Sequence, residues 1–140
     1  MDEKSKILVV DDDEDTRSNL RHVLVRDGYE VSEAENGRVA LERVAENRPN
    51  LILLDLMMPQ MDGFEFVAEL RKTHGWKSIP IIVVSAMDVG PEERAKLKGG
   101  VEMVLKKGSY TREELEEDVR ALIRSGGRSP SGEVPIPVVQ

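Results

Sequence analysis

The segment Leu51–Asp55 (Leu-Ile-Leu-Leu-Asp) constrains the fold more than any other, because four aliphatic residues in a row end on a carboxylate. Pro49 and Pro59 bound this run on either side. A short, wholly apolar run of this kind is typical of a strand buried on both faces of a parallel sheet. Asp55 is then the carboxyl end of the strand, where ligands bind in open α/β sheets.

Further short apolar runs alternate with segments of helical spacing along the chain. We expect strands over residues 7–10, 29–34, 51–55, 81–84 and 103–105, and helices over residues 16–26, 36–48, 62–74, 91–98 and 111–123. In the third helix, Phe64, Val67 and Leu70 are expected to share one face. Strict alternation with short links predicts an α/β fold: a doubly wound, five-stranded parallel sheet of order 2-1-3-4-5 with five helices on its two faces.

The chain has 140 residues, which is the size of one domain. From Ser125 the composition changes to a Gly-, Ser- and Pro-rich stretch. We therefore expect a domain over residues 1–124 and a flexible tail over residues 125–140.

Charge and composition exclude several classes of function. A net charge of -7 argues against direct binding to nucleic acid or to an anionic membrane surface. Cysteine is absent, so neither a disulfide framework nor a thiolate metal site can form. The start of the chain lacks a signal-peptide pattern, and no apolar run approaches the ~20 residues that span a bilayer. We expect a cytoplasmic protein without membrane insertion.

The residues that end the apolar runs carry reactive side chains. Because the carboxyl ends of parallel strands share one edge of the sheet, we expect these side chains to gather there. They are Asp11, Asp12, Asp55, Ser85 and either Lys106 or Lys107.

Three neighbouring carboxylates repel one another unless a proton or a cation neutralises them. With oxygen ligands alone, the suitable cation is hard, and Mg²⁺ fits best. Asp55 then has what a carboxylate nucleophile needs to attack phosphorus, namely a cation that screens the approaching charges and an ammonium for the transferring oxygens. The Ser85 hydroxyl can bind the resulting acyl phosphate.

Four motifs in order resemble the receiver domain of two-component response regulators, a family with the flavodoxin-like fold. They are the run 7–10 before Asp11-Asp12, the segment 54–63 (Leu-Asp-Leu-Met-Met-Pro-Gln-Met-Asp-Gly), the segment 80–86 ending in Ser-Ala, and Leu105-Lys106-Lys107. The resemblance covers residues 6 to about 124. It implies a phosphoacceptor signalling switch rather than an enzyme with a diffusible substrate. The partners that it implies for this switch are a sensor histidine kinase or phosphotransfer protein and a downstream protein target.

The resemblance also assigns roles to single residues. It makes Asp55 the phosphoacceptor, Asp12 and Asp55 direct Mg²⁺ ligands, and the backbone carbonyl of Met57 a third ligand, with Asp11 acting mostly through a bound water. Ser85 matches the hydroxyl residue that turns toward the phosphoryl group.

Periodicity leaves Lys106 and Lys107 as alternatives for the functional ammonium. The motif spacing of the family favours Lys107, which would pair with the phosphoryl group.

Two positions depart from the family pattern. The lysine is usually followed by proline, but Gly108 stands here, so the cis peptide typical of the family is not expected. Val104 occupies the place of an aromatic residue that swings inward on activation in many receivers. We therefore expect phosphorylation with a weak conformational response.

Three alternatives remain. A degenerate receiver could bind partners without phosphorylation, as Val104 and Gly108 suggest. A haloacid-dehalogenase-like phosphohydrolase could use an aspartate after the first strand, although Glu14 stands where its second acid would be Asp. Asp11, Asp13 and Asp15 have the alternate spacing of a calcium loop, but the loop lacks its glycine and its closing acid.

Overall fold

The computed structural model describes residues 4–76, 78–97 and 101–125. Within them lies a five-stranded sheet of order β2-β1-β3-β4-β5, and every neighbouring pair is parallel. The predicted α/β class and strand order are therefore confirmed. The strands are β1 (Lys6–Val10), β2 (Glu30–Ala34), β3 (Leu51–Leu54), β4 (Ile81–Ser85) and β5 (Met103–Lys106).

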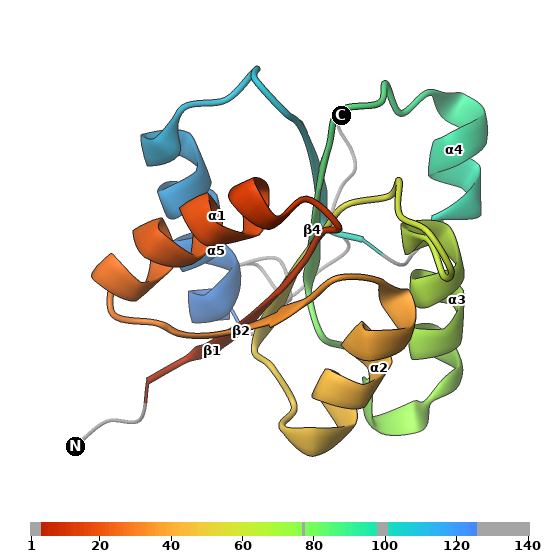
Figure 1. The fold of residues 1–140 in the computed structure, drawn as a ribbon, viewed down its shortest axis with the longest axis horizontal. Coiled ribbons are helices and arrows are strands. Elements are labelled where there is room, and N and C mark those ends of the chain that lie inside the picture. Colours follow the sequence, from red (N-terminus) through yellow and green to blue (C-terminus); the bar gives the residue numbers. More distant parts are fainter. Residues whose placement is uncertain (1–3, 77, 98–100, 126–140) are drawn as a thin grey trace.

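Five α-helices cover the two faces of this sheet, as predicted, with α1 and α5 on one side and α2, α3 and α4 on the other (Figure 1). A short 3₁₀ helix over His74–Trp76 was not predicted. The α-helices are α1 (Glu14–Arg26), α2 (Gly37–Glu46), α3 (Gly63–Lys72), α4 (Pro91–Lys96) and α5 (Arg112–Ser125).

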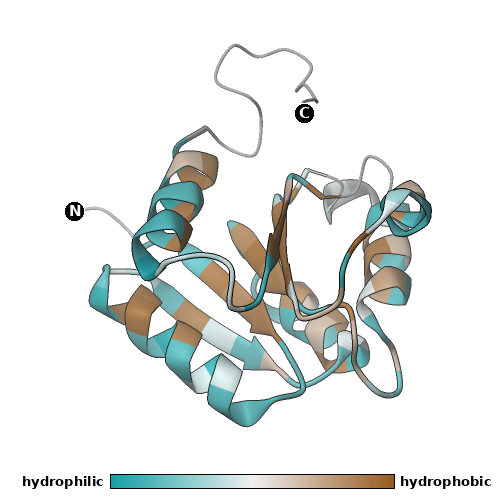
Figure 2. Cartoon of the chain, turned by 90° about the horizontal axis from the view of Figure 1, so that it is seen from above, coloured by the Kyte–Doolittle hydropathy of each residue, from teal (hydrophilic) through white to brown (hydrophobic). Residues whose placement is uncertain are grey.

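The side chains of each central strand point alternately to the two faces of the sheet. Because helices cover both faces, every residue in the middle of such a strand has to be apolar. In β1, Ile7 and Val9 pack in the cluster under α1 and α5, whereas Leu8 and Val10 pack in the cluster under α2 and α3. Strands β3 and β4 divide in the same way. Figure 2 shows the hydrophobic residues concentrated on the strands and on the helix sides that face them.

Helix ends differ from the expected ones for local reasons. Helix α1 begins at Glu14, two residues early, because Asp13 is its N-cap and accepts from the Thr16 N–H. The expected face of α3 is confirmed, since Phe64, Val67 and Leu70 all pack in the same core cluster, but the fully buried Phe66 was not predicted. Helix α4 ends at Lys96 with Leu97 as its C-cap, so it stops short of the predicted end, and residue 98 lies outside the described chain.

The tail was predicted over residues 125–140. Ser125 is instead the last residue of α5, and residues 126–140 lie outside the described residues, so the domain boundary stays a prediction. None of the helices in the described chain combines the length and apolar character required to cross a bilayer.

Candidate functional site

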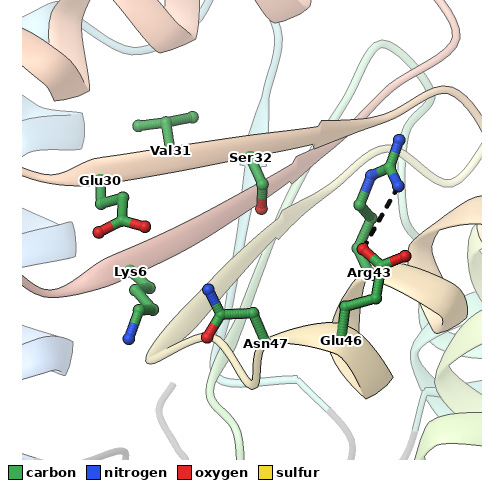
Figure 3. Close-up of a pocket in the computed structure, with 7 residues that line it drawn as sticks. All are labelled: Lys6, Glu30, Val31, Ser32, Arg43, Glu46 and Asn47. Carbon is green, nitrogen blue, oxygen red and sulfur yellow. Dashed lines mark ion pairs between the residues drawn. The ribbon is translucent and has the colours of Figure 1, made fainter.

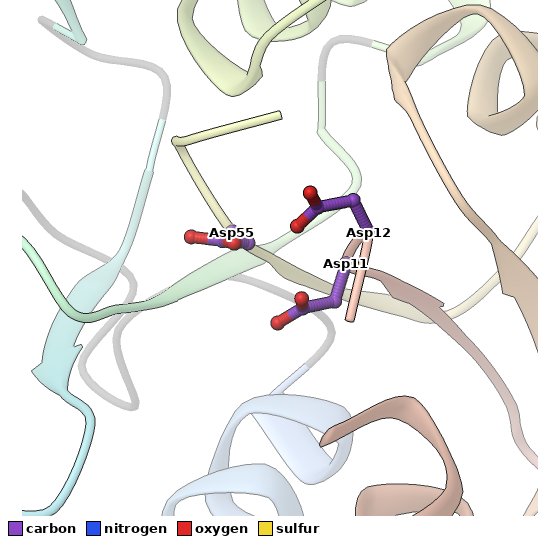
Figure 4. Close-up of side chains that lie close together, drawn as sticks. All are labelled: Asp11, Asp12 and Asp55. Carbon is purple, nitrogen blue, oxygen red and sulfur yellow. The ribbon is translucent and has the colours of Figure 1, made fainter. Parts of the chain in front are cut away.

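Three carboxylates converge where β1 and β3 end (Figure 4). Asp11 and Asp12 follow β1, and Asp55 follows β3, which is its hydrogen-bonded neighbour. The Asp55 N–H donates to the Val10 carbonyl at 2.9 Å and so extends the ladder to the acid itself. Each residue offers one carboxylate oxygen, and these oxygens lie within 4.8 Å of one another. The predicted gathering of acids is thus present in the fold.

The three acids differ in exposure. Asp11 and Asp55 are buried, with 2% and 5% of their surface exposed, whereas Asp12 is exposed. Charges are rarely buried unless they are paired or bind a metal. The site therefore needs a positive partner and offers an open side at Asp12.

Lys107 supplies part of that positive charge. Its Nζ lies 2.9 Å from Asp11 Oδ2 and 3.6 Å from Asp55 Oδ2, and its backbone N–H donates to the Ser85 carbonyl at 2.9 Å. Lys106 instead pairs with Asp88 at 2.7 Å on the exposed surface. Between the two lysines that the sequence left open, the fold directs Lys107 to the acids.

The pKa values of Asp11 and Lys107 reflect their burial and the charges around them. Burial raises the pKa of Asp11 above its ordinary 3.8, the Asp13 N–H and Lys107 oppose the rise, and the charge of Asp55 adds to it. Burial alone would lower the pKa of Lys107, but the hydrogen bond to Asp11 and the charges of both acids raise it above 10.5. One ammonium does not balance three carboxylates, so the remaining negative charge favours binding of a cation here.

The two remaining predicted residues flank this cluster. Ser85 ends β4, is completely buried, and its hydroxyl accepts from the Met87 N–H at 3.4 Å. Met57 donates its N–H to Asp55 Oδ1 at 3.3 Å, and 58% of Met57 is exposed. Both residues lie next to the acids in the fold, and their assigned roles stay predictions.

Sequence reasoning missed the close packing of the loop after β3 against Asp55 and Leu56. A Cβ on Gly63 would lie 2.7 Å from the Asp55 carbonyl oxygen and 2.7 Å from Leu56 Cα. Gln60, in the same loop, has a φ of 66°, a region that L-residues rarely adopt. The Asp-Gly pair at 62–63 was a visible signal, but only for the start of a helix.

Arg17 and Glu33 were missed as well. Arg17 Nη1 donates to the Asp11 carbonyl at 2.8 Å, and Arg17 Nε pairs with Glu33 Oε1 at 3.1 Å. An arginine two residues after an acidic run is a weak sequence signal, because most such side chains are exposed to solvent.

Two hollows differ in their relation to the acids. One opens beside Asp12 and is lined by Met57, Met58 and Phe64 among others. The other lies near Lys6 and Glu30, the first residues of their strands, with Arg43 paired to Glu46 at 3.5 Å (Figure 3). Because the second hollow is at the opposite end of these strands, it does not share the carboxylate cluster.

The donor set fits a hard divalent cation. Three carboxylates offer oxygen ligands only, as Mg²⁺ prefers. The calcium-loop alternative is wrong: Asp13 caps α1, with its Oδ2 accepting from the Thr16 hydroxyl at 2.6 Å, and Asp15 lies within that helix.

Comparisons with known proteins agree with this geometry. Residues 7–120 match the family described as response regulator receiver domain. Response regulator MprA from Mycolicibacterium vanbaalenii is 43% identical over 119 residues, which are 85% of this chain and 50% of that protein. Response regulator MprA from Mycobacterium leprae is 43% identical over 85% of this chain and 51% of that protein. The chain thus spans about half the length of the curated relatives that it matches.

The matches to solved structures of similar fold span nearly the whole length of those chains. The receiver domain of a signal transduction histidine kinase from Syntrophus aciditrophicus has a TM-score of 0.79 and 27% identity, over 96% of this chain and 99% of that chain. Chemotaxis protein CheY4 of Vibrio cholerae has a TM-score of 0.77 and 34% identity, over 84% of this chain and 98% of that chain. The phosphohydrolase alternative has no support from these matches.

Proposed function

Because the chain belongs to the response regulator receiver domain family, we propose that it is a two-component switch phosphorylated on Asp55 by a histidine kinase with Mg²⁺. Receiver domains are phosphoacceptor signalling modules rather than enzymes with a diffusible substrate. The observation that carries the proposal is the Asp55 carboxylate, buried beside two further acids and 3.6 Å from the Lys107 ammonium.

The cation would be held by the carboxylates of Asp12 and Asp55 and by the Met57 carbonyl, with Asp11 acting through a water. When bound, Mg²⁺ supplies positive charge that screens the phosphoryl oxygens from the acids. The open side at Asp12 supports this assignment, because Mg²⁺ usually keeps several waters.

Asp55 performs the covalent step. One carboxylate oxygen attacks phosphorus, the P–N bond of a phosphohistidine breaks, and the electron pair leaves with the imidazole, which takes up a proton. Lys107 binds a transferring oxygen, and the Ser85 hydroxyl donates to the acyl phosphate once it has formed.

The switch acts by protein contact. Its partners are a sensor histidine kinase or phosphotransfer protein and a downstream protein, without direct nucleic-acid binding or membrane insertion, in the cytoplasm. The acidic net charge of -7 argues against direct binding to nucleic acid or to an anionic membrane. The receiver domain spans residues 1–124.

Incubation with acetyl phosphate and Mg²⁺ tests the proposal. We expect one hydroxylamine-labile phosphoryl adduct by intact mass, and none on Asp55→Asn, which keeps the shape of the side chain but removes the nucleophilic charge. An unmodified wild type would contradict the proposal and favour the degenerate receiver. Sustained turnover of a small phosphate ester would instead favour the phosphohydrolase.

Mg²⁺ affinity is expected to fall as pH is lowered toward the raised pKa of Asp11, because the proton competes with the cation. The same shift affects stability: protonated Asp11 stabilises the metal-free fold fully below pH 3.8, and this contribution is lost as pH rises through the folded pKa. Calorimetric titration with Mg²⁺ at about pH 7.5 and about pH 5 measures the first effect. Asp11→Asn is the control, and an equally steep pH dependence in that variant would contradict the assignment.

Phosphorylation is expected to change the fold only weakly around β5. Val104 is partly buried against the core and has no ring that could exchange between an inner and an outer position. Amide exchange with and without beryllofluoride and Mg²⁺ measures the response. Large changes in protection across residues 86–110 would contradict this prediction.

A further inference from the structure

Arg17 joins the acidic loop to the rest of the sheet through one guanidinium group. It lies in the first turn of α1, and only 15% of its side chain is exposed. Its Nη1 donates to the Asp11 carbonyl at 2.8 Å, and its Nε donates to Glu33 Oε1 in β2 at 3.1 Å. A planar guanidinium with two fixed partners has little freedom to rotate, so its position is well defined.

Glu33, in β2, determines the position of the Arg17 guanidinium. Its second oxygen, Oε2, pairs with Arg21 Nε at 3.0 Å, so that both carboxylate oxygens are held by α1. The Glu33 backbone is fixed too, because it pairs with Val9 in the ladder and its carbonyl accepts from Arg43 Nε at 3.1 Å. Glu33 therefore orients Arg17 toward the Asp11 carbonyl.

The bonded carbonyl belongs to the peptide that links Asp11 to Asp12. Asp11 is already held at its N–H by the Ala34 carbonyl at 3.1 Å and at Oδ1 by the Asp13 N–H at 2.9 Å. Arg17 in turn fixes the plane of the Asp11–Asp12 peptide. This plane sets the direction in which the Asp12 side chain leaves the backbone. Asp12 is exposed, so its direction depends on this plane more than on side-chain packing.

We infer that Arg17, oriented by Glu33, is a positioning residue for the divalent-cation site, acting through the Asp11–Asp12 peptide. This inference rests on the proposed function, because it concerns the same Mg²⁺. Partners outside the direct ligands that hold them in place change metal affinity by about 10- to 100-fold in other sites.

The alternative is a purely structural role, in which Arg17 only attaches α1 to β2. Arg21 provides a matched control for this alternative. Arg21 lies one turn later on the same helix and pairs with the same carboxylate, but the contact to the Asp11 carbonyl belongs to Arg17. A purely structural role predicts similar effects of Arg17→Gln and Arg21→Gln on every measurement. A positioning role predicts that only Arg17→Gln lowers the affinity for Mg²⁺.

The experiment measures Mg²⁺ binding by calorimetry and thermal unfolding of the metal-free protein for both variants, with Arg17→Lys and Glu33→Gln added. We expect Arg17→Gln to weaken Mg²⁺ binding about 10-fold and Arg21→Gln to leave it within about twofold. Arg17→Lys keeps the charge but lacks the two-pronged geometry, so it is expected to bind Mg²⁺ more weakly than the wild type. In acetyl phosphate reactions, Arg17→Gln should raise the half-saturating Mg²⁺ concentration while the rate at saturating Mg²⁺ is unchanged.

The outcomes separate this inference from the proposed function. A wild type that binds no Mg²⁺ overturns both. A wild type that binds Mg²⁺ together with Arg17→Gln that binds it within twofold overturns the inference alone. An equal loss in Arg21→Gln also overturns it, because the effect would then come from attachment of the helix. If Arg17→Gln does not fold, Glu33→Gln decides instead, with weakened Mg²⁺ binding expected and unchanged binding overturning the inference.

Discussion

Replacing Lys107 by methionine is expected to slow phosphorylation of Asp55 by about 10²- to 10³-fold, the usual loss when one group that stabilises transition-state charge is removed. Lys107 Nζ lies 2.9 Å from Asp11 and 3.6 Å from Asp55, so the variant leaves two buried carboxylates without their ammonium. The raised pKa of Lys107 keeps the ammonium charged through neutral and mildly alkaline pH. Initial rates of adduct formation with acetyl phosphate, followed by intact mass at saturating Mg²⁺, measure the loss.

Lys106→Met is the matched control for this prediction. Lys106 is the adjacent residue, but its Nζ pairs with the exposed Asp88 at 2.7 Å. We expect its rate to stay within about twofold of the wild type, since exposed ion pairs contribute little. A Lys107→Met protein that folds normally and reacts within threefold of the wild type would show that the ammonium has no part in the transfer.

The fold was largely predictable because its strands are encoded by a strong local signal. Buried parallel strands need apolar side chains on both faces, and the runs 7–10 in β1, 51–54 in β3 and 81–84 in β4 meet that need. Helix α3 shows where this reasoning fails. Phe64 and Phe66 both fit a helical stripe, and only packing against the strands decides that Phe66 is buried.

The site was predictable where backbone topology alone brings residues together. Asp11, Asp12 and Asp55 follow neighbouring parallel strands, and their convergence follows from strand order. The choice between Lys106 and Lys107 depends on side-chain direction at the end of β5, which periodicity does not specify. The contact from Arg17 to the Asp11 carbonyl involves a backbone acceptor, and such an acceptor leaves no trace in the sequence.

Gly63→Ala is expected to destabilise the protein by about 3 kcal/mol, at the upper end of the cost of overpacking. The added Cβ would lie 2.7 Å from the Asp55 carbonyl oxygen, 2.7 Å from Leu56 Cα and 2.8 Å from Leu56 Cδ2. Two of these atoms belong to the backbone, and Leu56 is 1% exposed in the core, so relief requires the segment that carries Asp55 to shift. The midpoint of urea unfolding of the metal-free protein measures the change.

Gly75→Ala separates this steric clash from the general effect of replacing glycine. A Cβ on Gly75 would meet no atom within 4 Å, so we expect a change within about 0.5 kcal/mol. Because the shift forced by Gly63→Ala starts at the Asp55 carbonyl, the variant should also form the phosphoryl adduct more slowly even at temperatures where it is folded. Equal stability of the two alanine variants would mean that the loop after β3 is free to move, and Asp55 would then lack the rigid support that its position beside Asp11 and Asp12 requires.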